Sequence, residues 1–313
     1  MMERTVFRHY MHLAAVIVTA VWVGCARDTL HNHDAIQRLK SPDAAERMRA
    51  ADALGRSLDL EPDAPEAVDA LIVALDDSDR LVQTAATAAL AGSGLRSPTA
   101  VPALLRTLRD TLHPRAREQA AMVLGGFGAR ARPEVVMALE FALRDSVPAV
   151  RSAAADALGK IGSTARPSLG SLARMTGDSS AVVRADVAKA AASIDPLDRQ
   201  SRAILLSLIR DERSDVRLVA LQGLSRDTTA GPNEMSAFAD MLRDADSRVR
   251  LAAAETLGSF GARALPVVPA LTSALSDGDS IFRRQVTIAI ASIEGAAHES
   301  SPEPVPQPRR RQP

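Results

Sequence analysis

The chain has 313 residues and a formal net charge of zero, and 46% of its residues are apolar, with alanine and leucine dominant. β-Branched runs with the length of a strand are scarce, so the composition predicts an all-α protein. Proteins that neutralise many phosphates usually carry a basic surplus. This chain has none, and no nucleic acid is expected as a partner.

The first 24 residues have the features of a signal peptide. Arg4 and Arg8 give a cationic start, and residues 13–23 form an apolar run that is followed by Gly24. This run is shorter than the roughly 20 apolar residues that a membrane-spanning helix needs. We therefore predict that the chain is exported to the cell envelope.

The only cysteine, Cys25, follows this run directly, so no disulfide can form within the chain. The string VWVGC resembles the lipobox of bacterial lipoproteins, although Trp22 stands where an aliphatic residue is usual. The resemblance implies lipidation of Cys25 and a membrane anchor. The alternative is cleavage after Ala26, which yields a soluble periplasmic or secreted protein. Residues 25–33 are predicted to form a tether.

A repeat of about 33 residues extends over residues 34–297. The equivalent positions are spaced by 36, 34 and 34 residues and then by 33 in each remaining step. Such regularity predicts about eight repeats in one array. The positions are Arg47, Gln83, Arg117, Arg151, Arg184, Arg217, Arg250 and Arg283.

Each repeat is predicted to form two helices, because its apolar residues recur at three- and four-residue spacing. In the fourth repeat the helices are expected over residues 132–145 and 148–162, with Pro133 and Pro148 in their first turns. One helical pair cannot bury its own apolar face, so neighbouring pairs stack into an α-solenoid.

A row of aspartates lies six residues before the arginines. It comprises Asp77, Asp145, Asp178, Asp211, Asp244 and Asp277, with Ser41 in the first repeat and Asp110 displaced by one residue. The pattern D-x-x-x-x-V-R-x-x-A-A-x-A-L-G resembles HEAT repeats, particularly the short type also seen in phycobilin lyases. The resemblance implies an Asp in the turn within each repeat, paired with backbone amides and a neighbouring Arg. We expect these residues to form a structural ladder and not an anion-binding strip.

No catalytic, metal or cofactor site is predicted. Within residues 34–297 there is no cysteine and a single histidine, His113, which is most simply a solvated turn residue beside Pro114. His31 and His33 are likewise expected to be solvated and not metal ligands. The chain is therefore not expected to be an enzyme; a lyase activity would follow from likeness of fold alone.

The residue five positions after each ladder Arg is expected to lie on the exposed, concave face of the second helix. These positions are Asp52, Ala88, Met122, Asp156, Lys189, Gln222, Glu255 and Ile288. Their varied chemistry predicts a binding strip for a protein partner, centred on Asp156, Lys189, Gln222 and Glu255. Residues 298–313 are rich in proline and arginine and are expected to be disordered. The predicted function is an envelope-anchored scaffold for protein interaction.

Overall fold

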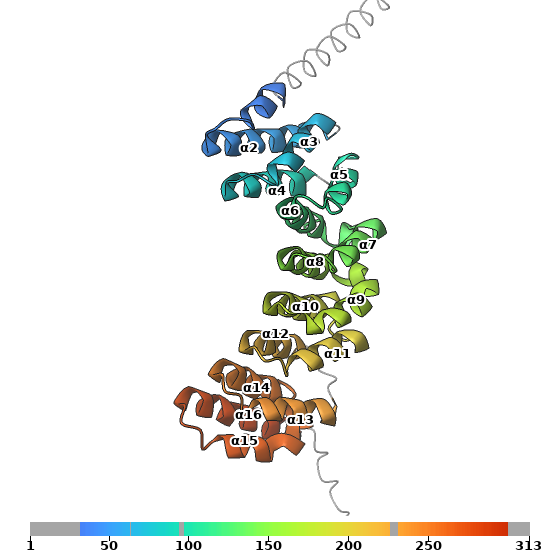
Figure 1. The fold of residues 1–313 in the computed structure, drawn as a ribbon. Helices are drawn as coiled ribbons and strands as arrows, with labels where there is room; N and C mark the ends of the chain where they lie inside the picture. The colour runs from blue at the N-terminus through green and yellow to red at the C-terminus, as the bar shows by residue number, and fades with distance from the viewer. Residues whose placement is uncertain (1–31, 63, 94–96, 226–230, 300–313) are drawn as a thin grey trace, which may run out of the picture. The chain divides into compact units, whose positions relative to one another are not determined.

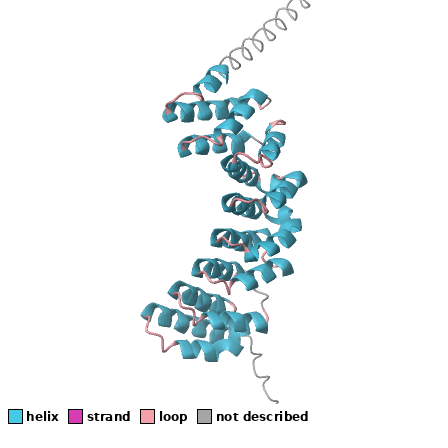
Figure 2. Ribbon diagram, viewed as in Figure 1, coloured by secondary structure: helices cyan, strands magenta, loops and turns pink. Residues whose placement is uncertain are grey.

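The computed structural model describes residues 32–62, 64–93, 97–225 and 231–299, all of whose regular elements are helices (Figures 1 and 2). The predicted all-α solenoid is confirmed. The predicted signal peptide, Cys25, His31 and residues 300–313 lie outside the described residues. None of the described helices combines the length and the apolar character that crossing a membrane requires.

The chain divides into two compact units, and the first ends at Ile161. It opens with a short helix over residues 32–38. The helices that follow are α2 (Ala44–Leu60), α3 (Pro65–Ala74), α4 (Arg80–Ser93), α5 (Ala100–Thr107), α6 (Pro114–Gly125), the 3-10 turn η1 (Gly128–Arg130), α7 (Pro133–Ala142) and α8 (Pro148–Ile161).

The second unit begins at Gly162 and repeats the same plan. Its elements are η2 (Gly162–Ser168), α9 (Leu169–Arg174), η3 (Met175–Gly177), α10 (Ala181–Ile194), α11 (Arg199–Leu208), α12 (Ser214–Leu224), α13 (Pro232–Met241), α14 (Ser247–Ser259), η4 (Gly261–Val267), α15 (Val268–Ala274) and α16 (Ser280–Glu299).

Each unit consists of two layers of helices. The second helices of successive repeats pack on one another, as α2, α4, α6 and α8 do in the first unit and α10, α12, α14 and α16 in the second (Figure 1). The first helices, such as α3, α5 and α7, form the other layer. Leu71, Leu104 and Leu139 from one layer and Leu54 and Leu124 from the other are fully buried. The core of the unit therefore lies between the layers, as stacking of repeats requires.

The helix ends follow from local sequence. As predicted, α7 and α8 begin at Pro133 and Pro148, where the missing N–H is not needed. Gly128, Gly162 and Gly261 adopt positive φ angles of 55°, 71° and 54° just after second helices. Only glycine takes this conformation without strain, so these residues turn the chain toward the next repeat.

The array extends slightly beyond the predicted bounds. Residues 32 and 33 are helical, so His33 belongs to the first helix and not to the predicted tether. At the other end α16 continues to Glu299, past the predicted limit at residue 297.

Candidate functional site

The ladder residues connect successive repeats. Arg184 donates from Nε and Nη2 to the carboxylate of Asp211, over 2.6 and 2.8 Å, and from Nη1 to the carbonyl of Asp178, over 2.7 Å. Its own turn therefore holds one edge of the guanidinium while the next repeat supplies the carboxylate. We call each such Arg–Asp contact a rung.

Three further rungs have the same two-pronged geometry, and each Nε to Oδ2 distance is 2.7 Å. They are Arg47 with Asp77, Arg117 with Asp145, and Arg217 with Asp244. A weaker contact joins Arg250 to Asp277 over 3.4 Å. The carboxylate of each rung therefore comes from the next repeat, whereas for Arg184 and Arg217 the aspartate six residues earlier offers a backbone carbonyl.

The remaining ladder residues contact repeat turns as well. Arg151 is buried and donates from Nη1 to the carbonyl of Asp145 over 2.9 Å. Asp178 accepts the backbone N–H of Ser180. Arg283 donates from Nη1 to the carbonyl of Asp277 over 2.7 Å, in the last repeat of the array.

The ladder has a gap in the first unit. Gln83 takes the arginine position, and its carboxamide donates to the carbonyl of Asp77. Asp110, which would receive the missing guanidinium, accepts the backbone N–H of Leu112 through Oδ1, over 2.8 Å. Its Oδ2 lies 2.9 Å from His113 Nδ1. An imidazole thus replaces the guanidinium at this one carboxylate.

The electrostatics of the gap follow from this pair. The hydrogen bond to Asp110 and its negative charge raise the pKa of His113 above its ordinary value, and the charge of Asp76 adds to the effect. The same hydrogen bond lowers the pKa of Asp110. His113 is exposed, as predicted, but it is hydrogen-bonded to Asp110, with which it forms an ion pair when protonated.

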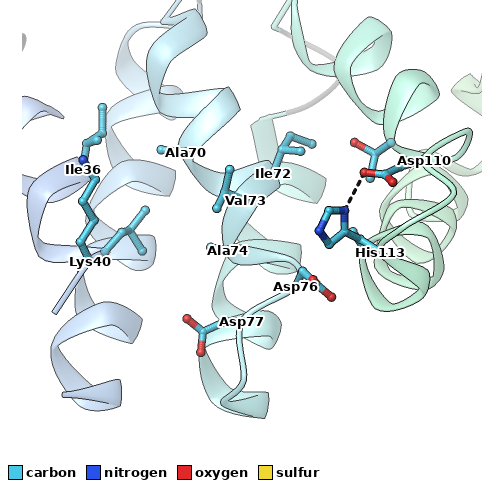
Figure 3. Close-up of a pocket in the computed structure, with 13 residues that line it drawn as sticks. Ile36, Lys40, Ala70, Ile72, Val73, Ala74, Asp76, Asp77, Asp110 and His113 are labelled. Atoms are coloured by element: carbon cyan, nitrogen blue, oxygen red, sulfur yellow. Dashed lines mark hydrogen bonds and ion pairs between the residues drawn. The ribbon is translucent and has the colours of Figure 1, made fainter. Parts of the chain in front are cut away.

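A pocket of about 550 Å³ opens beside the gap (Figure 3). It is lined by the helix over residues 32–38 and the turn after it, by α3 and the turn after it, and by the turn between α5 and α6 with the adjoining helix ends. Apolar side chains of Ile36, Leu39, Ile72 and Val73 form much of the wall. We call this pocket the groove. The sequence signal for it was the glutamine at an arginine position, followed by a displaced aspartate.

The predicted binding strip lies on the second helices. All of its eight residues are exposed except Asp156, which is half-buried. Asp156 pairs with Lys160 over 2.7 Å, and Lys189 pairs with Asp186 over 3.0 Å. Gln222 and Glu255 are exposed on α12 and α14. The structure therefore puts the strip on the outer side of one helical layer in each unit.

No group of three or more histidine, cysteine, aspartate or glutamate side chains within the described ranges is arranged to hold a metal ion. The polar side chains of the rungs hold repeats together, whereas Asp110 and His113 in the groove depart from the repeat pattern.

The chain was compared with known proteins and structures. No curated protein matches it. Among solved structures, Escherichia coli YibA is 18% identical, with a TM-score of 0.56 over 86% of this chain and 96% of that one. An engineered protein is 19% identical, with a TM-score of 0.50 over 86% and 81% of the two chains. A mutant of Kap121p is 16% identical, with a TM-score of 0.50 over 84% of this chain and 33% of that one. These likenesses show the fold.

The family model described as HEAT repeats matches residues 33–125, 107–176 and 235–304. These matches include the gap in the ladder and the groove beside it. Since they span more than half of the sequence, the chain belongs to the HEAT-repeat family.

Proposed function

We propose that this protein is a non-catalytic scaffold that binds a protein partner through the strip on its second helices. The contrast between two sets of positions carries the proposal. Ladder positions keep Arg and Asp in most repeats, with Ser41 and Gln83 as exceptions, because they hold the array together. Strip positions change from Asp156 to Lys189, Gln222 and Glu255, although each lies at the same place in its repeat.

Such variation on a uniform framework suits recognition of one particular surface. A stack of repeats presents an extended face, and each repeat can contribute one side chain to it. The alternation of acidic, basic and amide groups favours a partner with a mixed polar surface over a uniformly charged polymer.

The proposal is tested by affinity capture with full-length protein from cells that produce it. A variant with Lys189, Gln222 and Glu255 changed to Ala should lose a partner that the unaltered protein retains. The matched control changes Arg174, Asp240 and Thr272 to Ala, which are exposed polar residues on the first helices of the same unit. Equal recovery by both variants and the unaltered protein would exclude the strip as the binding surface.

We further propose that the scaffold is exported and anchored to the membrane by a lipid on Cys25. The apolar run before Cys25 and the small residue Gly24 support this proposal. Cys25→Ser should move the protein from the membrane fraction to the soluble fraction and abolish incorporation of a labelled fatty acid. An unlabelled but exported protein would instead support the soluble adaptor.

A further inference from the structure

The gap in the ladder retains the geometry of a rung whose cation is missing. Gln83 and Asp110 are 27 residues apart, which is also the spacing in the rungs Arg184–Asp211 and Arg217–Asp244. In those rungs one carboxylate oxygen accepts a turn N–H and both oxygens face the guanidinium. Asp110 keeps the turn contact through Oδ1, so its carboxylate is oriented as in a rung.

The groove beside Asp110 adds an acidic group and an apolar surface. Asp76 is half-buried, and its carboxylate has no hydrogen-bond or ion-pair partner among the described residues, whereas the carboxylate of its neighbour Asp77 is held by Arg47. Val73 is 76% exposed, and Ile72 lies beside it on α3. In Figure 3, Asp76, Asp110 and His113 lie at one end of the groove, and Lys40 and Ile36 lie at the other.

We propose that the groove binds a segment of a protein partner in which an arginine or lysine is flanked by apolar residues. The basic group bonds to Asp110 and Asp76 in place of the missing ladder arginine, and the apolar side chains cover Ile72 and Val73. Lys40 repels a cation from the other end and so fixes the direction of the segment. This inference rests on the proposed role as a protein-binding scaffold and names a second surface for it.

Binding is expected to depend on pH through His113. The charged groups that face it are Asp110 from its own turn and Asp76 from the turn after α3. The other charged residues of the lining are Lys40 and Asp77, and Asp77 is paired with Arg47. Protonated His113 competes with the incoming cation for Asp110. Affinity should therefore rise as the pH increases through the raised pKa of His113, and binding below that pKa should release a proton.

The test uses full-length protein and a capped, fluorescently labelled hexapeptide with a central arginine between leucines. Fluorescence anisotropy should show saturable binding at pH 8 that weakens at pH 5.5. Asp76→Asn and Asp110→Asn should each weaken it by roughly tenfold or more, as expected for loss of a hydrogen bond to a charged group. Glu140→Gln, an equal charge change on α7 outside the groove, should leave it unchanged.

Two further variants separate a filled gap from a damaged fold. Gln83→Arg restores the ladder residue, which should bind Asp110 internally, raise the thermal stability and abolish peptide binding. Gln83→Met has similar bulk without a guanidinium and should retain binding. A third variant, His113→Gln, tests the pH dependence. It should bind the peptide with nearly the same affinity at pH 8 and at pH 5.5.

Three results would overturn the inference: no binding of the arginine peptide by the unaltered protein, equal binding of a peptide with glutamate in place of arginine, or full binding by a folded Gln83→Arg variant. Each of these leaves the strip proposal intact if the strip variant still loses its partner. Loss of strip-dependent capture with arginine-specific peptide binding retained would instead refute the strip alone.

Discussion

The guanidinium of each two-pronged rung bonds to two repeats at once, which makes it an unusually sensitive position. The side chains of Arg184 and Asp211 are only 7% and 6% exposed. Removing one partner of such a pair leaves the other charge buried and unpaired. Arg184→Ala should therefore lower the free energy of unfolding by about 3 kcal/mol, as measured by urea denaturation.

The matched control is Arg213→Ala. Arg213 pairs with Asp215 at 61% and 54% exposure, so its loss should cost less than about 1 kcal/mol. Equal losses for the two variants would show that the buried rung has no special role.

The same carboxylates make the fold sensitive to acid. Burial raises the pKa of Asp211. Hydrogen bonds from Arg184 and from the Arg213 N–H lower it, and together they outweigh burial, so the pKa lies below its ordinary value. A group with a lowered pKa stabilises the fold above its unfolded pKa, and this stabilisation is lost as the pH falls through the folded pKa. The thermal unfolding temperature should therefore decrease when the pH is lowered below about 4. In the Arg184→Ala variant the unfolding temperature should depend less on pH in this acidic range. An unchanged pH dependence would contradict the stabilising role of the Arg184–Asp211 pair.

Close contact between second helices depends on small residues at the same place in several repeats. A Cβ added at Gly125 would lie 2.6 Å from the backbone of Ala157, and one at Gly55 would lie 2.7 Å from the Cβ of Ala89. Glycine here therefore sets the distance between α6 and α8 or between α2 and α4, and is not only a helix breaker.

A pair of glycine substitutions tests this interpretation. Gly125→Ala should push α6 and α8 apart and lower the free energy of unfolding by about 1–3 kcal/mol. A Cβ added at Gly92, in α4, would meet nothing within 4 Å. Gly92→Ala should therefore be neutral or raise the free energy of unfolding by about 0.5 kcal/mol. Chemical denaturation of both variants measures these changes. An equal loss of unfolding free energy in the two variants would contradict the packing argument.

Stability of the entire array should be additive between units and coupled within one. Arg47→Ala and Arg217→Ala lie in different units and share no partner, so their effects should add within about 0.5 kcal/mol. Arg184 and Arg217 both bond to Asp211, one to its carboxylate and the other to its carbonyl. The double variant of these two should deviate from the sum by more than about 0.5 kcal/mol. Urea denaturation of the three single and two double variants tests both statements.

The spacing of the arginines was enough to predict the array, because each repeat is a local unit whose helices follow from nearby residues. It was not enough to predict the contacts between repeats. Arg184 is six residues from Asp178 and 27 from Asp211, yet stacking makes the distant aspartate the carboxylate partner. The groove escaped prediction for the same reason, since Lys40, Asp76 and His113 come from three turns that only stacking brings together.

The rungs all point in one direction along the chain, and this has a consequence for how the array can change in evolution. A 33-residue segment duplicated within the second unit would bring an aspartate for the repeat before it and an arginine for the repeat after it. Both new junctions would be complete without a compensating substitution. Gene duplication can therefore lengthen such a protein in whole repeats, whereas loss of one ladder arginine leaves a carboxylate without its guanidinium, as at Asp110, where His113 takes that place.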